Sequence, residues 1–582
     1  MEETEKAINS IKSLLKKENI KKILYVDDKF DTNEQKQFFI GQMKAVKFSG
    51  NPPSATDYPE FSNIKWTSPD PVFETQINEY WKNNDQTISL QRICSYIDND
   101  ISSNIIPALE IKQVLGDIVE LFTPDEWVAK HKDELESLED GEKHLCLFDF
   151  EFENWSGKNG ESNGVHLAKL IIESDFNEKV CCGIFSHKYS IEDEDETRFT
   201  YSSTYDVDAK LFYTISKKRF AFDPQLAAFA EGIKNIISLK YIEDLKDKSI
   251  SILENSFTEA IEELKSLSPK TFNLIVQKAS VHEGIWEANS LFRLHKILQN
   301  YSNYKLFTDD ATKSSFETSM SKIRDLDFEE TGYQFPHKDQ NAIAIHKREV
   351  YYEKDIINKL YFPISNGDIF QIGQKKYILL SQPCNLAIRK SGKRNYDYNK
   401  AFIVPLVDKS REDKELSTVR YCKLRSISPE TRTYADFPNF KTVSLDIMDL
   451  CVFNDDGIAK MDLSITEISN PLIHFPLIKR YTKIHSVFKK QGNAYVAFND
   501  IKAQLPTELK GSVDKLTPFF KTPECIKELK LGGRNIFNTQ NKSFDFGIQR
   551  IKNYKEPYST DLLQNFMQYL SRNDFDVDFS QF

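Results

Sequence analysis

The sequence predicts an α/β domain at the N-terminus, a helical middle segment and a β-rich α+β domain at the C-terminus. Short apolar runs that end in polar side chains alternate with helix-like stretches up to about residue 220. Long helical periodicities follow, and period-two alternation of apolar and polar residues begins after residue 345. We therefore assign 1–220, 221–345 and 346–582 to the three parts, which suits a chain of this length.

The first domain is expected to begin with a helix and to contain four strands. Apolar residues at helical spacing predict a helix over 5–17. The strands are ILYVDD (23–28), HLCLFDFEF (144–152), VCCGIFSH (180–187) and KLFYTISKKRF (210–220). Further helices are expected over 104–123 and 164–174. Strands that alternate with helices predict a parallel sheet.

The later parts differ in their periodicity. PQLAAFAEGIKNIISL (224–239) and SVHEGIWEANSLFRLHKILQNY (280–301) predict long helices. GDIFQIGQKKYILLSQPCNL (367–386) and NKAFIVPLV (399–407) alternate with period two, which is typical of strands. The last predicted element is a helix over 556–570, for which Ser559 is the expected N-cap.

Charge and composition exclude several classes of protein. Residues 1–220 hold 26 Lys and Arg against 41 Asp and Glu, so the chain is not a uniformly basic nucleic-acid-binding protein. A hydrophobic content of 40% with 12% aromatic residues excludes a disordered chain. The eight cysteines include no CxxC pair, and no apolar stretch reaches about 18 residues. We therefore expect a cytoplasmic protein with reduced thiols and no membrane span.

Polar side chains follow each of the four predicted strands. The first strand ends at Asp27 and Asp28, the second at Asp149, the third at Ser186 and the fourth at Lys217. In an open parallel sheet these carboxyl ends share one edge, so we expect the side chains to gather there. Carboxylates that gather repel one another unless a cation is present, and oxygen ligands suit Mg²⁺. A hydroxyl and a lysine beside them would bind phosphoryl oxygens, so the set describes an aspartate that accepts phosphate.

The residues in this pattern resemble the receiver domain of two-component response regulators. The matching segments are ILYVDD (23–28), LFDFEF (147–152), NGVHLAKLI (163–171), IFSH (184–187) and ISKKRF (215–220). The resemblance implies a flavodoxin-like, doubly wound parallel sheet. It also implies that Asp27 and Asp28 hold Mg²⁺, that Asp149 is both a metal ligand and the phosphoryl acceptor, and that the Glu151 carbonyl completes the metal sphere.

The resemblance further implies how the domain would be used. Ser186 would be the switch hydroxyl and Lys217 the phosphoryl contact, and phosphorylation would draw both inward. A histidine kinase would be the phosphodonor, and the C-terminal domain or a separate protein effector would receive the signal. The chain departs from the family in an insertion at about 33–140, which enlarges the domain, and in a long loop after Ser186 that carries IEDEDE. In addition, Lys218 stands where the family usually has proline. A register shift of one residue would make Lys218 the phosphate contact.

Other interpretations stay open at this point. An Asp-Asp pair after a strand can also cap a helix, so the domain could retain its acids as structural groups and act only as a docking module. The protein would then be an effector whose basic C-terminal clusters bind or cleave nucleic acid. An anti-phage defence system would suit either role. The two basic clusters are Arg389, Lys390, Lys393 and Arg394, and Lys479, Arg480, Lys483, Lys489 and Lys490.

Overall fold

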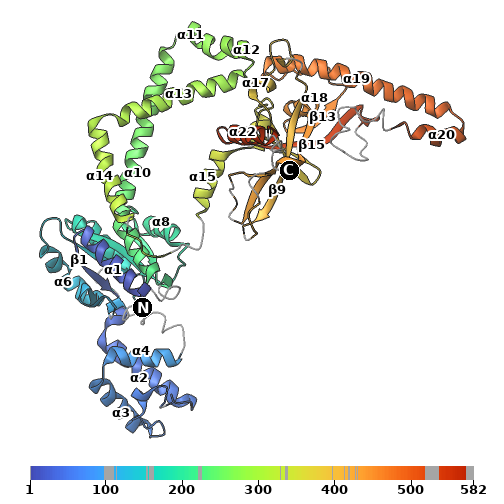
Figure 1. Cartoon of the computed structure of the whole chain (residues 1–582). Helices are drawn as coiled ribbons and strands as arrows, with labels where there is room; N and C mark the ends of the chain where they lie inside the picture. The colour runs from blue at the N-terminus through green and yellow to red at the C-terminus, as the bar shows by residue number, and fades with distance from the viewer. Residues whose placement is uncertain are drawn as a thin grey trace, which may run out of the picture. The chain divides into compact units, whose positions relative to one another are not determined.

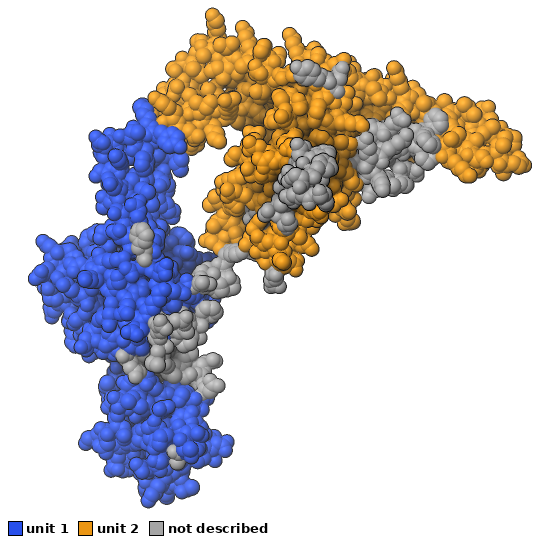
Figure 2. Space-filling view, viewed as in Figure 1, with its two compact units in different colours: residues 1–256, 303–337 blue, residues 257–302, 338–582 orange. Residues whose placement is uncertain are grey.

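Two sheets of different type organise the chain, one parallel and one antiparallel (Figure 1). The computed structural model describes residues 2–54, 56–97, 111–112, 114–152, 155, 157, 163–219, 226–327, 329–333, 339–395, 398–411, 413–416, 420–425, 428, 430–517 and 537–571. Unit 1 comprises residues 1–256 and 303–337, and unit 2 comprises residues 257–302 and 338–582 (Figure 2). Each unit holds one of the two sheets.

The sheet of unit 1 has five parallel strands in the order β2-β1-β3-β4-β5. Its strands are β1 (Ile20–Val26), β2 (Val119–Phe122), β3 (Lys143–Asp149), β4 (Val180–Ser186) and β5 (Phe212–Ser216). This order is that of flavodoxin-like sheets, so the predicted parallel α/β architecture is confirmed. The order makes β1 and β3 neighbours, although 116 residues separate Val26 from Lys143 in the sequence.

Helices cover both faces of this sheet. Alternate residues of each strand point to opposite faces, and the strands are buried on both sides. Tyr25 belongs to a core with residues of α1 and α10, whereas Val26 belongs to a second core with residues of α6 and α7. The helices of the layer are α1 (Glu2–Lys17), α6 (Pro124–Glu136), α7 (Gly164–Ile172), α8 (Glu194–Tyr205) and α10 (Ala227–Ser266). The helices expected over 5–17 and 164–174 are present.

A helical subdomain follows β1. Its helices are α2 (Thr32–Ser49), α3 (Asp70–Asn83) and α4 (Gln86–Ile97). Their apolar faces form a separate core around Phe39, Phe73 and Trp81. The helix expected over 104–123 is wrong at its C-terminal end, because Val119–Phe122 form the edge strand β2; residues 101–110 lie outside the described part. The later part of the segment 33–140 therefore contributes β2 and α6 to the sheet layers.

The helical prediction for the middle segment is confirmed. After α10 the chain forms α11 (Pro269–Asn273), the π-helical turn η5 (Leu274–Lys278), α12 (Ala279–Glu283), α13 (Glu287–Phe307), α14 (Asp310–Asp327) and α15 (Gln340–Val350). Its residues are divided between the two units. Over the described ranges, none of the helices combines the length and apolar character that crossing a bilayer requires.

Unit 2 contains the antiparallel sheet, in the order β10-β11-β9-β8-β7-β15-β13, with β12 paired to β9 and β6 and β14 paired to β15. The strands are β6 (Tyr351–Glu353), β7 (Asp368–Ile372), β8 (Lys375–Leu380), β9 (Lys400–Ser410), β10 (Tyr421–Lys423), β11 (Thr431–Asp436), β12 (Lys441–Ser444), β13 (Ile458–Asp462), β14 (Phe537–Asn538) and β15 (Ser543–Tyr554). The β-rich prediction is confirmed.

Helices pack on both faces of the antiparallel sheet. The helices of this part are α16 (Lys354–Lys359), α17 (Pro383–Leu386), α18 (Leu445–Leu450), α19 (Phe475–Gln504), α20 (Thr507–Asp514) and α22 (Tyr558–Leu570). Residues of α18 and α19 share a core with Phe370, whereas α22 packs with Ile369 on the other face. Ser559 is not the N-cap of α22, because the helix begins at Tyr558 and places Ser559 inside its first turn.

Candidate functional site

Three aspartates meet at the carboxyl edge of the parallel sheet. Asp27 and Asp28 follow β1, and Asp149 ends the neighbouring strand β3. Each of the three offers a carboxylate oxygen, and these oxygens lie within 4.8 Å of one another. All three residues are buried. The structure thus brings together the three carboxylates that the sequence places at strand ends.

A buried lysine lies among these carboxylates. Lys217, directly after β5, places its Nζ 2.9 Å from Asp27 Oδ2 and 3.1 Å from Asp149 Oδ1. Its residue exposure is 3%, whereas the next residue, Lys218, is exposed. Of the two lysines considered from the sequence, Lys217 therefore lies in the site.

The site carries an excess of negative charge. Three carboxylates against one ammonium leave two negative charges if every group is ionised. Burial raises the pKa of Asp149 to about 7; Lys217 opposes this rise, and Asp27 adds to it. Burial alone would lower the pKa of Lys217, but Asp149 and Asp27 outweigh it and raise that pKa well above its ordinary value. A divalent cation would balance the excess.

More hydrogen bonds hold the carboxylate of Asp27 than that of Asp149. Asp27 Oδ2 accepts hydrogen bonds from the Tyr25 hydroxyl and from Lys217, and its Oδ1 accepts from the Lys29 amide at 3.0 Å. Asp149 uses only Oδ1, which accepts from the Phe150 amide at 2.9 Å and pairs with Lys217. Among the described residues no hydrogen bond reaches Asp149 Oδ2. This oxygen is the one available to a reacting group.

The start of α7 packs closely against the end of β3. A Cβ at Gly164 would lie 2.0 Å from the Asp149 carbonyl oxygen, so only glycine permits this approach. The Gly164 amide donates to the Phe150 carbonyl at 3.1 Å. Asn163 caps the helix by accepting hydrogen bonds from the amides of Val165 and His166. The close approach of Gly164 and its hydrogen bond to Phe150 therefore hold the end of β3 against the start of α7.

Ser186 and Glu151 have contacts of their own near the cluster. The Ser186 hydroxyl, at the end of β4, accepts a hydrogen bond from the Lys188 amide at 3.3 Å, and its carbonyl accepts from the Lys217 amide at 2.7 Å. The Glu151 side chain is exposed and forms an ion pair with Lys188. No hydrogen bond or ion pair joins the side chain of either described residue to the three aspartates, so a switch hydroxyl at Ser186 and a carbonyl ligand at Glu151 stay predictions.

A second buried ion pair lies next to the site. Arg219, two residues after Lys217, bonds Glu194 through Nε at 2.7 Å and through Nη2 at 2.6 Å. Its Nη1 also donates to the Ala228 carbonyl in α10 at 2.7 Å. The sequence analysis missed this pair, although the basic run after β5 and the acidic loop IEDEDE offered a signal. Arg219 thus joins the end of β5 to α8 and α10.

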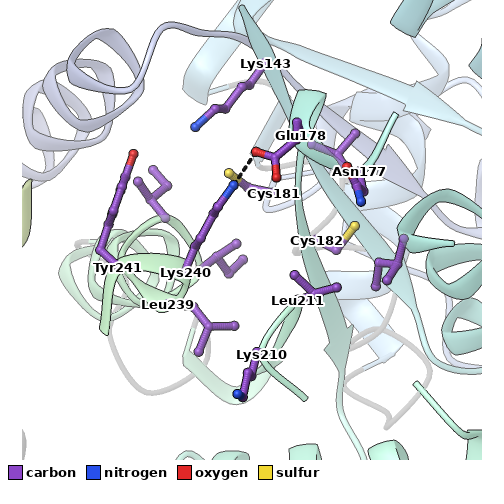
Figure 3. A pocket seen from close by; sticks show the side chains of 14 residues that line it. Lys143, Asn177, Glu178, Cys181, Cys182, Lys210, Leu211, Leu239, Lys240 and Tyr241 are labelled. Atoms are coloured by element: carbon purple, nitrogen blue, oxygen red, sulfur yellow. Dashed lines mark hydrogen bonds and ion pairs between the residues drawn. The ribbon is translucent and has the colours of Figure 1, made fainter. Parts of the chain in front are cut away.

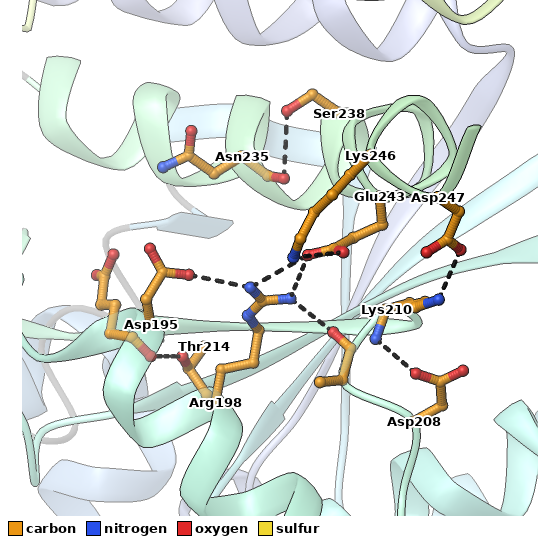
Figure 4. Close-up of polar contacts among 12 residues, drawn as sticks. Asp195, Arg198, Asp208, Lys210, Thr214, Asn235, Ser238, Glu243, Lys246 and Asp247 are labelled. Carbon is orange, nitrogen blue, oxygen red and sulfur yellow. Dashed lines mark hydrogen bonds and ion pairs between the residues drawn. The ribbon is translucent and has the colours of Figure 1, made fainter. Parts of the chain in front are cut away.

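Further polar contacts hold α8 against α10 (Figure 4). Arg198 of α8 is buried, with Nη1 3.4 Å from Glu243 Oε1 of α10 and Nη2 3.2 Å from Asp195. Arg198 Nη1 also donates to the Ala209 carbonyl at 2.7 Å. These contacts fasten the helix before β5 to the helix after it.

A small cavity of unit 1 lies at the amino ends of the strands, away from the carboxyl ends that hold the acidic cluster. Figure 3 shows the side chains that line it. It measures about 50 Å³ and is lined by Lys143 at the start of β3, Cys181 near the start of β4, and Lys240 and Tyr241 of α10. Since these residues belong to the amino ends of the strands, the cavity is separate from the acidic cluster. It is too small for more than a few water molecules.

The donor set fits a hard divalent cation. Asp27, Asp28 and Asp149 supply only carboxylate oxygens, which are the ligands that Mg²⁺ and Ca²⁺ take. Sulfur or imidazole ligands, which zinc sites use, do not belong to the cluster.

Comparison of the chain with protein-family models gives no match, and comparisons with curated proteins and with solved structures give none either. The function is therefore inferred from the chemistry of these residues.

Proposed function

We propose that unit 1 is a receiver-type regulatory domain, which accepts a phosphoryl group on Asp149 with the help of Mg²⁺ and thereby regulates unit 2. The observation that supports this proposal is the meeting of three buried carboxylates and one buried lysine at the carboxyl edge of a flavodoxin-like sheet. Asp27, Asp28 and Asp149 would hold the ion. The phosphodonor would be the phosphohistidine of a histidine kinase.

Asp149 is the acceptor in this proposal because one of its oxygens is available. Oδ1 is held by the Phe150 amide and by Lys217, so Oδ2 would attack the phosphorus atom. The new O–P bond forms as the bond from phosphorus to the histidine nitrogen breaks, and the departing imidazole takes a proton from solvent. Both Asp27 oxygens already accept hydrogen bonds, which makes Asp27 a positioning ligand.

Charge balance explains the other groups. Mg²⁺ would supply positive charge to the phosphoryl oxygens as they approach the carboxylates. Lys217 would exchange its contact with Asp149 Oδ1 for a phosphoryl oxygen while keeping its contact with Asp27. The Ser186 hydroxyl would donate a hydrogen bond to the same group. A displacement of Lys217 would be passed to Arg219, which is bonded to α8 and α10.

Transfer from a small phosphodonor tests the proposal. The full chain is incubated with acetyl phosphate and MgCl₂, and the intact mass is measured. We expect a gain of one phosphoryl group in the wild type and none in Asp149→Asn or when EDTA replaces the metal. Asp117→Asn, at an exposed aspartate of the same unit, is the matched control and should gain the group. No gain in the wild type, or an equal gain in Asp149→Asn, would refute phosphoryl transfer to Asp149.

A docking module that binds the ion without chemistry is the competing function. Asp27 favours this function because it also has a structural role: its Oδ1 accepts a hydrogen bond from the Lys29 amide and so caps the short helix η1 (Asp28–Phe30). In that case Mg²⁺ would slow hydrogen exchange in β1 and β3, yet the mass would not change with the phosphodonor. The two functions therefore give different results in the same pair of measurements.

A further inference from the structure

Two basic segments that are distant in the sequence form one surface in unit 2. The turn 389–394 lies against α19, and a Cβ at Gly392 would be 2.9 Å from the Lys479 Cβ. Lys479 Nζ donates to the Lys390 carbonyl at 3.3 Å, and Lys483 Nζ donates to the Ser391 carbonyl at 2.7 Å. These contacts bring the first basic cluster of the sequence beside Lys479 and Lys483 of the second.

The two arginines of these clusters have a structural role. Arg394 is buried and forms a bidentate pair with Asp449, at 2.7 Å and 2.6 Å. Arg480 is also buried, pairing with Asp446 and, at 3.1 Å, with Asp449. Their charges are therefore offset within the fold, and Arg480 cannot present its guanidinium to a partner without leaving these carboxylates.

The remaining basic side chains lie at the surface, although Arg389 is half-buried and donates a hydrogen bond to the Glu283 carbonyl. We define the basic ridge as Arg389, Lys390, Lys393, Lys479 and Lys483, of which the four lysines are exposed. Among the described residues, neither Lys479 nor Lys483 has a carboxylate within ion-pair distance. Burial lowers the pKa of Lys483, and Lys393, Arg480 and Lys479 lower it further. The lysines of the ridge thus repel one another, and an anion that bridges them would relieve this repulsion.

Residues of the ridge line two hollows. One, of about 540 Å³, is lined by Lys278 and His282 together with Arg389 and Lys390. The other, of about 230 Å³, is lined by Lys393 and Lys483 above the buried pairs of Arg394 and Arg480. A partner with several regularly spaced negative groups could therefore contact the ridge from either hollow.

We propose that the basic ridge binds the phosphate backbone of a single-stranded nucleic acid. The row of lysines offers several phosphate contacts at once, which is how nucleic-acid surfaces gain affinity. Beside it, Phe475 is half exposed, and Lys479 Nζ lies 4.8 Å from the centre of its ring. An exposed ring among lysines suits the stacking of an unpaired base, which an acidic protein segment does not offer. This inference is independent of phosphoryl transfer in unit 1.

Fluorescence anisotropy with a labelled single strand of about 20 nucleotides tests the ridge. We expect the wild-type full chain to bind, and Lys479→Glu/Lys483→Glu to weaken binding about a hundredfold with a salt slope lower by about 1.4, since two phosphate contacts with a single strand are lost. The matched control is Lys489→Glu/Lys490→Glu, which changes two exposed lysines of the same helix by the same charge. The control should bind like the wild type.

Three results would overturn the proposal. Absence of binding by the wild type is the first. An equal loss in both double variants is the second, because it would mean general attraction to a basic helix. Tighter binding of a duplex or of polyglutamate than of the single strand is the third. Phe475→Ala should reduce single-strand affinity without changing the salt slope.

Discussion

Replacement of Asp149 by asparagine probes the charge balance of the acidic cluster. Burial, opposed by Lys217 and assisted by Asp27, raises the pKa of Asp149 from an ordinary 3.8 to about 7. Between these two values the folded chain keeps a proton that the unfolded chain releases, so the free energy of unfolding falls as the pH rises. A shift of about three units corresponds to roughly 4 kcal/mol at pH 8. Asparagine has the same shape without the charge.

We therefore expect Asp149→Asn to stabilise unit 1 by about 4 kcal/mol at pH 8 without metal, and by little at pH 4. Hydrogen exchange of the β1 and β3 amides, followed by mass spectrometry in EDTA, isolates this unit from the rest of the chain. The amides should exchange up to about a thousandfold more slowly in the variant. Added Mg²⁺ should slow exchange in the wild type and not in Asp149→Asn.

Asp117→Asn removes an exposed carboxylate of the same unit and should leave exchange at β1 and β3 unchanged. If Asp149→Asn exchanges as fast as the wild type at pH 8 in EDTA, then ionisation of Asp149 does not lower the free energy of unfolding of unit 1. If Mg²⁺ protects both proteins equally, the ion binds elsewhere. The first result would refute the charge balance inferred for the cluster, and the second would refute the assignment of a metal site to these carboxylates.

Three further predictions concern pH, backbone space and buried charge. Mg²⁺ affinity measured by titration calorimetry should fall about tenfold for each pH unit below 7, because the ion must displace the proton of Asp149; a flat profile would contradict this. Gly164→Ala should cost about 2–3 kcal/mol and weaken Mg²⁺ binding, since its Cβ would meet the Asp149 carbonyl. Gly41→Ala, in open space on α2, should instead gain up to about 1 kcal/mol, and equal urea midpoints for the two variants would refute the contact. Asp449→Ala should destabilise unit 2 by about 3–5 kcal/mol because it leaves Arg394 buried without its partner, and an unchanged urea transition would argue against that pair.

The meeting of Asp27, Asp28, Asp149 and Lys217 could be predicted from the sequence because it follows from local signals and one rule. Each residue ends a short apolar run, and parallel strands place their carboxyl ends on one edge. The run itself marks the strand, so no knowledge of distant contacts was needed. Lys217 and Lys218 could not be separated, since a one-residue shift decides which of them is buried.

The sequence-based predictions failed in two situations. In one, a short apolar pattern fits both a helix and a strand; in the other, charged residues that are far apart in the sequence pair in the fold. β2 has four residues, of which Val119 and Phe122 are buried, and that spacing also fits one turn of a helix. Arg394 and Arg480 looked like surface charges, although the apolar segment LDIMDL holds Asp446 and Asp449, which need partners when buried. Nothing in their sequence spacing says that these partners would be the two arginines.

Within unit 1, the helical subdomain follows the parallel sheet immediately after the acid pair. The three residues of η1 follow Asp27, and Asp31 caps α2 directly afterwards. A helix of 18 residues is about 27 Å long, so a tilt of about 10° at its base would move its far end by about 5 Å. A movement around Asp28 that tilted α2 by this amount would therefore displace Ser49 far enough for a pair of fluorophores to detect.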